Sequence, residues 1–157
     1  GNGTVETEFS ATWSSKNASA CQWAFDGVVQ GPIDCAGHSG GHRLAAGNHK
    51  VTLIATGAGG TRICDSNTVS VIHPAPMCLA EISPRFGGYK TKFSVKWLSS
   101  NADSCTWSFD GVDQGPVACS GESKDHHLSS WFHYVTLTAT GPGGTTTCRS
   151  NGVWVYQ

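Results

Sequence analysis

The chain has 157 residues, a length that allows one ordinary domain or two small ones. Charged residues make up 13% of it, its formal net charge is −1, and it has no polybasic run, which argues against nucleic acid as a partner. The 38% hydrophobic and 10% aromatic residues supply a core that disordered chains lack. No apolar run approaches the roughly 20 residues that span a bilayer, so we expect no membrane insertion.

The first half of the chain recurs in the second half without a gap, each residue matching one about 84 positions later. The pairs include Trp13 and Trp97, Cys21 and Cys105, Asp26 and Asp110, Cys35 and Cys119, and Cys64 and Cys148. A Pro-rich spacer, His73-Pro-Ala-Pro76, separates the copies and is typical of a short, extended linker. We therefore predict two domains, 1–73 and 74–157.

Strand signals are clearest in the second copy. Apolar residues alternate with polar ones over 93–97 and again over 105–109, and Asp110-Gly111 then supplies the positive-φ pair of a tight hairpin. A β-branched strand is predicted over 134–140, and a last strand over 148–156. No window shows helical periodicity. The predicted fold class is all-β, two tandem immunoglobulin-like β-sandwiches with intradomain disulfides.

The runs 23–31 and 44–60 resemble the bacterial Ig-like and PKD-like repeats of secreted enzymes and surface adhesins. Those families carry a similar strand, an Asp-Gly hairpin, and an Ala-Gly-x-His-x-Val-Thr-Leu strand followed by a Gly-rich turn. The likeness covers most of each copy and implies an Ig-like fold. It says little about function, because its motifs encode the fold.

Seven cysteines in a short chain, none in a Cys-x-x-Cys pair, indicate a disulfide framework made in an oxidising compartment, so we expect an extracellular or cell-surface location. Four cysteines in the second copy allow three connectivities, and the sequence does not choose among them. The pairing we prefer is Cys21 with Cys35, Cys105 with Cys119, and Cys78 with Cys148, which leaves Cys64 unpaired. The residue that matches Cys78 would fall before Gly1, so we expect the first copy to lack its opening strand.

No catalytic residue, metal site or cofactor is predicted. His42 and His49 recur as His126 and His133, but no carboxylate recurs nearby to complete a metal site. Asp26 and Asp110 each precede a glycine, which is turn chemistry, and glycoside hydrolysis needs two converging carboxyl groups. A Gly-x-Ser-x-Gly elbow is also missing. We expect a protein that is not an enzyme.

Some aromatic residues of the second copy are not required by the fold. Trp131 and Trp154 stand where the first copy has Gly47 and Ser70. Trp131 and Phe132 are predicted at a turn where, with Tyr134, they can stack on sugar rings or contact a neighbouring repeat. The other four tryptophans, Trp13, Trp23, Trp97 and Trp107, are predicted to be core residues.

The functional expectation is an extracellular structural or adhesive tandem repeat, part of a larger surface, stalk or filament protein. Its partners would be neighbouring repeats or copies of the same protein, and possible further partners are glycans. The alternative is a carbohydrate-binding pair appended to a secreted glycoside hydrolase. Asn2 and Asn17 lie in N-glycosylation sequons, but the match of Asn17 is Asn101-Ala-Asp103, which is not a sequon and favours a turn role for the asparagine.

Overall fold

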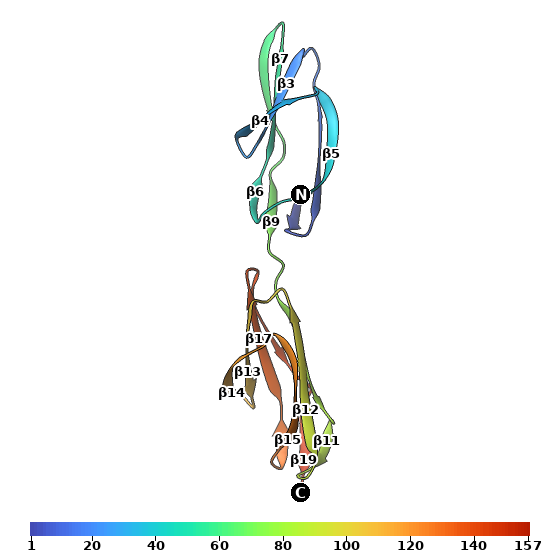
Figure 1. Ribbon diagram of the computed structural model, residues 1–157, viewed down its shortest axis with the longest axis vertical. Coiled ribbons are helices and arrows are strands. Elements are labelled where there is room, and N and C mark those ends of the chain that lie inside the picture. Colours follow the sequence, from blue (N-terminus) through green and yellow to red (C-terminus); the bar gives the residue numbers. More distant parts are fainter. The chain divides into compact units, whose positions relative to one another are not determined.

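In the computed structural model, which describes residues 1–157, the chain consists of β-strands without a helix. It forms two compact units, Gly1–His73 (unit 1) and Pro74–Gln157 (unit 2), each an immunoglobulin-like β-sandwich (Figure 1). No helix is available to span a membrane. The spacer residues Pro74 and Ala75 belong to unit 2, where Asn101 Nδ2 donates to Ala75 O at 3.4 Å.

Unit 2 has two facing layers of strands. The first is the sheet β10-β12-β15, and the second contains the sheets β14-β13-β17-β18 and β11-β19-β16. The strands are β10 (Met77–Ser83), β11 (Phe86–Gly88), β12 (Lys92–Ser100), β13 (Ser104–Phe109), β14 (Val112–Val117), β15 (Ser120–His127), β16 (Trp131–His133), β17 (Val135–Gly141), β18 (Gly144–Arg149) and β19 (Val153–Tyr156).

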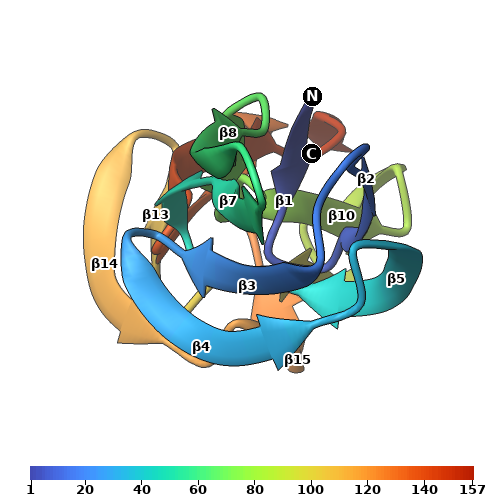
Figure 2. The ribbon, with the colours of Figure 1, turned by 90° about the horizontal axis from the view of Figure 1, so that it is seen from above.

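Unit 1 repeats this arrangement with one strand fewer. Its sheets are β2-β5, β4-β3-β7-β8 and β1-β9-β6, and Figure 2 shows β3 beside β4. No strand corresponds to β10, so β2 pairs with β5 alone. The strands are β1 (Asn2–Thr4), β2 (Glu8–Ser14), β3 (Ala20–Phe25), β4 (Val28–Ile33), β5 (Ala36–Arg43), β6 (Gly47–His49), β7 (Val51–Gly57), β8 (Gly60–Asp65) and β9 (Val69–Ile72).

The core of unit 2 lies between its layers. In β12 the predicted alternation is confirmed, because Phe93 and Val95 are buried while Lys96 and Leu98 are exposed. The buried side chains that meet there are Ile82, Phe93, Val95, Val135, Val153 and Val155. The predicted hairpins also form, with positive φ at Asp26 and Gly27 in unit 1 and at Asp110 and Gly111 in unit 2.

The structure contains the three preferred disulfides, Cys21–Cys35, Cys105–Cys119 and Cys78–Cys148, and Cys64 is free and exposed. Cys78 lies in β10 and Cys148 in β18, so this bond joins the two layers of unit 2. Cys105 lies in β13 and Cys119 directly precedes β15, so the second bond also crosses between the layers.

Two predictions need correction, and a third is confirmed in part. The last strand is broken into β18 and β19, because Ser150 and Asn151 bind other parts of unit 2 through their side chains. Trp131 and Phe132 lie in β16 and not in a turn. The core prediction is confirmed for Trp97 and Trp107, which pack against the core clusters of unit 2. All four tryptophans expected in the core are nevertheless only half-buried. For Trp13 and Trp97 the reason is that each indole N–H donates to a backbone carbonyl near the surface, that of Asp34 or Ala118.

Candidate functional site

The segment before β17 is held at its C-terminal end by one carboxylate. Asp110 follows β13, and its Oδ2 accepts a hydrogen bond from His133 Nδ1 at 2.5 Å. Its Oδ1 accepts from the Tyr134 backbone N–H at 2.9 Å, and His133 Nε2 lies 2.9 Å from Ser129 O. The His133 ring is buried and stacks on Phe109. These contacts fix the base of the short strand that carries Trp131 and Phe132.

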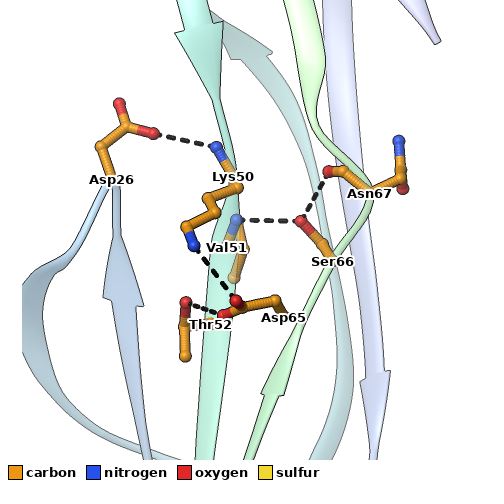
Figure 3. Close-up of polar contacts among 7 residues, drawn as sticks. All are labelled: Asp26, Lys50, Val51, Thr52, Asp65, Ser66 and Asn67. Carbon is orange, nitrogen blue, oxygen red and sulfur yellow. Dashed lines mark hydrogen bonds and ion pairs between the residues drawn. The ribbon is translucent and has the colours of Figure 1, made fainter.

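Unit 1 has the same device. His49 Nδ1 lies 2.6 Å from Asp26 Oδ2, and His49 Nε2 lies 2.8 Å from Ala45 O. Figure 3 shows the third contact, in which the Lys50 N–H donates to Asp26 Oδ1 at 2.9 Å. The pKa of His49 is raised by its hydrogen bond to Asp26 and, less strongly, by its hydrogen bond to the Ala45 carbonyl. The pKa of Asp26 is lowered by the hydrogen bonds that it accepts from His49 and from the Lys50 backbone. The structure contains no group of three His, Cys, Asp or Glu side chains placed to hold a metal ion. Through the hydrogen bonds described above, each aspartate–histidine pair ties the segment before β7 or β17 to the hairpin that follows β3 or β13.

Unit 1 is expected to be most stable between the ordinary pKa values of these two groups, 3.8 for Asp26 and 6.5 for His49. A raised histidine pKa stabilises the fold below 6.5, and this contribution is lost as the pH rises through the folded value. A lowered aspartate pKa stabilises the fold above 3.8, and this contribution is lost as the pH falls through the folded value. Calorimetry should show the thermal midpoint of unit 1 falling as the pH drops below 3.8 and as it rises above 6.5.

The matched control for this pH dependence is Asp26→Asn, which removes the carboxylate and keeps an acceptor for the Lys50 N–H. Its midpoint should fall less steeply above pH 6.5 than that of the wild type. A wild-type midpoint that does not change over this alkaline range would contradict the ionic role of His49.

An aromatic surface covers the outer face of the sheet β11-β19-β16. We define it by Phe86, Trp131, Phe132 and Trp154, which come from all three strands. Phe86 and Phe132 are the direct neighbours of Trp154 in the sheet, and direct neighbours share one face. Phe86, Trp131 and Trp154 are 69%, 72% and 59% exposed. Exposed aromatic groups gathered in this way mark a contact surface more often than a fold requirement.

Trp131 reaches this surface through an unusual backbone conformation. In a regular strand it would share a face with its pairing partner Val155, which is buried. Its φ is instead 150°, and its ring lies 6.3 Å from that of Trp154 in an edge-on arrangement. Gly47 occupies the equivalent position in unit 1 with a φ of 142°. A large side chain held in a conformation that favours glycine is a feature that clusters at functional sites.

Phe132 is supported from below. Its ring lies 5.1 Å from Trp154 and 6.4 Å from Tyr134, and the Arg149 guanidinium lies 3.6 Å from the centre of the Tyr134 ring. A Cβ at Gly152 would overlap the Phe132 ring, so the close approach requires glycine there. Unit 1 has no aromatic–guanidinium contact at the matching positions. Lys50 and Asp65 stand in place of Tyr134 and Arg149 and form an ion pair at 3.1 Å.

The structure thus brings together the four residues predicted from sequence, Trp131, Phe132, Tyr134 and Trp154. It adds Phe86, Arg149 and Gly152, which the sequence reasoning missed. A comparison of the two copies could have identified these three residues, because unit 1 has the different residues Asn2, Asp65 and Thr68 at the matching positions. The two sequon residues belong to unit 1. Asn2 and Asn17 are both exposed, and Asn17 has the positive φ of 59° that suits its predicted turn role.

No family model and no curated protein matches this chain. Among solved structures, it is similar to the Clostridium thermocellum CbhA fibronectin(III)-like modules, with 14% identity, 99% of this chain and 89% of that chain covered, and a TM-score of 0.38. A chimeric titin Z1Z2 tandem gives 10% identity, coverages of 99% and 94%, and a TM-score of 0.36. A Dscam structure is 8% identical, with 99% of this chain and 43% of that chain covered and a TM-score of 0.41. The chain therefore spans less than half the length of that structure. At these scores the likenesses carry no functional argument.

Proposed function

We propose that this chain is a structural or adhesive segment of an extracellular protein, and that the aromatic surface of unit 2 is where it contacts a neighbouring copy. The observation that carries the proposal is the comparison between the two units. At the positions of Phe86, Trp131, Phe132 and Trp154, unit 1 has Asn2, Gly47, Asn48 and Ser70 on the same strands. The sandwich therefore forms without aromatic groups there, and unit 2 exposes them at a cost in backbone strain.

The disulfides support the extracellular part of the proposal. Two bonds tie unit 2 and one ties unit 1, as is typical of small domains that fold in an oxidising compartment. The repeated scaffold supports the structural part, because stacked similar modules present surface in series. No group in the aromatic surface has the acid, base or nucleophile that a catalytic role would require.

The relative tilt of the rings favours a protein contact over a flat polysaccharide. Trp131 and Trp154 are inclined at 65°, and Phe132 and Trp154 at 54°, so they form an uneven surface of protruding rings. Such a surface fits complementary hollows of a protein partner. The exposed face of Trp131 alone can still stack on one sugar ring, which keeps carbohydrate binding as the second candidate.

The test replaces the four aromatic residues by their unit 1 equivalents, as Phe86→Asn, Trp131→Gly, Phe132→Asn and Trp154→Ser. In sedimentation velocity over a concentration series, the wild type should self-associate, and the variant should associate at least about tenfold more weakly because it loses several large apolar contacts. Val112→Ser, at a 64% exposed position of β14, is the control and should associate like the wild type.

Two outcomes would overturn the proposed self-contact. One is equal association of wild type and fourfold variant. The other is a monomeric wild type that is retained on a polysaccharide column while Trp131→Gly is not, a result that would establish the carbohydrate alternative.

A further inference from the structure

Unit 1 contains a groove between its two layers with a volume of about 990 Å³. Its walls include Phe9, Ala11 and Trp13 of β2, Leu53 of β7, and Cys64 and Asn67 near the end of β8. The edge of β2 beside it has no partner strand, since β2 pairs with β5 alone. An unpaired edge next to an apolar groove is a template for an added strand.

Unit 2 shows what lies in the equivalent place. There β10 pairs antiparallel with β12 over Met77–Ser83, and it buries Ala80 and Ile82, which are 5% and 0% exposed. Cys78 of the same strand is bonded to Cys148. The equivalent of Cys148 in unit 1 is Cys64, which is free and exposed.

A second contact, independent of the cysteine, recognises the strand backbone. Asn151 Oδ1 accepts a hydrogen bond from the Ile82 N–H, and Asn151 Nδ2 donates to Ile82 O, both at 2.9 Å. These two hydrogen bonds bind the backbone of the residue four positions after Cys78. Asn67 is the equivalent in unit 1; its side chain is exposed, and the contact drawn for it in Figure 3 is made by its backbone oxygen.

Asn67 is already held in the arrangement of Asn151. In unit 2 the Val135 N–H donates to Ser150 Oγ at 2.9 Å, and Ser150 Oγ donates to Asn151 O at 2.8 Å. In unit 1 the Val51 N–H donates to Ser66 Oγ at 2.9 Å, and Ser66 Oγ donates to Asn67 O at 2.8 Å (Figure 3). The receiving geometry of unit 1 is therefore preorganised.

The exposure of the surrounding residues agrees with a missing cover. Ser150 is 8% exposed and Val135 and Val153 are almost fully buried in unit 2, whereas Ser66 is exposed and Val51 and Val69 are half-buried in unit 1. These residues have the same types in both units, so the difference arises from their surroundings.

We infer that unit 1 is an acceptor for an extended strand from outside these 157 residues, with the pattern cysteine, any residue, small apolar, any residue, large aliphatic. In the register of β10 on β12, its cysteine lies opposite Ser15, its small residue opposite Trp13 and its aliphatic residue opposite Ala11. Asn67 binds the backbone of the aliphatic residue, and Cys64 forms a disulfide with the cysteine.

The bond forms by thiol–disulfide exchange when the strand cysteine arrives as a mixed disulfide with glutathione. The Cys64 thiolate attacks the sulfur of the strand cysteine, the bond between that sulfur and glutathione breaks, and glutathione leaves as its thiolate. One disulfide is consumed and one is formed, so no further oxidant is needed.

The test uses the whole chain and a synthetic peptide with the sequence of Ala75–Arg85, its cysteine carried as the glutathione mixed disulfide. Mass spectrometry should show attachment at Cys64 at least about tenfold faster than for the same peptide with Ile82→Asp, because burial of the aliphatic side chain is lost. Asn67→Ala in the chain should reduce this preference. Hydrogen exchange should slow at the β2 amides of the adduct.

Cys64→Ser in the chain is the control for attachment and should give no adduct. Equal rates for the two peptides would overturn the inference, as would an adduct whose β2 amides exchange as fast as before, since Cys64 would then be an accessible thiol without a strand site. A chain dimer bonded from Cys64 of one copy to Cys78 of another would also overturn it, because the strand would then come from a second copy.

Discussion

Phe93→Ala is expected to lower the free energy of unfolding of unit 2 by about 4 kcal/mol. Phe93 is 1% exposed, and its ring lies in the centre of the core cluster with Ile82, Val135 and Val153. Truncation removes the transfer free energy of the ring and leaves a cavity that strands from two layers cannot close. Hydrogen exchange of the β17 amides measures this loss for unit 2 alone.

The matched control is Phe9→Ala, at the equivalent position of unit 1. Phe9 is half-buried and borders the open groove, so its truncation creates little new cavity and should cost about 2 kcal/mol or less, read at the β7 amides. Equal losses in the two units would mean that the groove does not weaken the packing of Phe9. That result would also remove one argument for the acceptor role of unit 1.

The main features of the fold were predictable because they depend on local patterns. Alternation placed Phe93 and Val95 inside, and Asp110-Gly111 set the hairpin, since both signals lie within a few residues. The preferred cysteine pairing is the one that the structure contains, although the sequence left three connectivities open for the second copy. Strand alternation and an Asp-Gly hairpin are incompatible with a helical fold.

Features that depend on distant contacts were not predictable. The break between β18 and β19 depends on Asn151, which binds Ile82 at a separation of 69 residues. Nothing near Asn151 in the sequence indicates that partner, although its recurrence as Asn67 marked it as a repeat feature. The sequence predicted Trp131 as a contact residue in a turn, but not its place in β16, where strand alternation would put it on the buried side of Val155 and a φ of 150° exposes it instead.

The repeat also explains how one scaffold can carry two different surfaces. Both units keep the Asp–His tie and the Ser–Asn loop, which hold the backbone in the same form. The side chains on that backbone differ, so unit 2 exposes aromatic rings where unit 1 has polar groups and glycine. Unit 1 instead leaves a strand position open that unit 2 fills with β10. The two proposals therefore concern separate units and can fail independently.

Replacing both cysteines of the Cys78–Cys148 bond by serine is expected to cost unit 2 about 4 kcal/mol. The bond joins residues 70 apart, and closing a loop of that size restricts the unfolded chain by about this amount. The Cys105–Cys119 bond spans 14 residues, for which the same argument gives about 3 kcal/mol. Since small domains have a total stability of only about 5–15 kcal/mol, the first variant should unfold unit 2 at a markedly lower temperature in calorimetry.

Cys64→Ser is the control that connects this prediction to the acceptor groove. Cys64 matches Cys148 but has no bonded partner in this chain, so its replacement should change the stability of unit 1 by no more than about 0.5 kcal/mol. After incubation with the β10 peptide, the wild-type unit 1 should gain stability and the variant should not, because only the wild type can hold the strand covalently. A large loss on Cys64→Ser alone would mean that the free thiol already stabilises unit 1 by packing. That result would measure how much the Cys64 thiol stabilises unit 1 by packing, apart from any disulfide with an added strand.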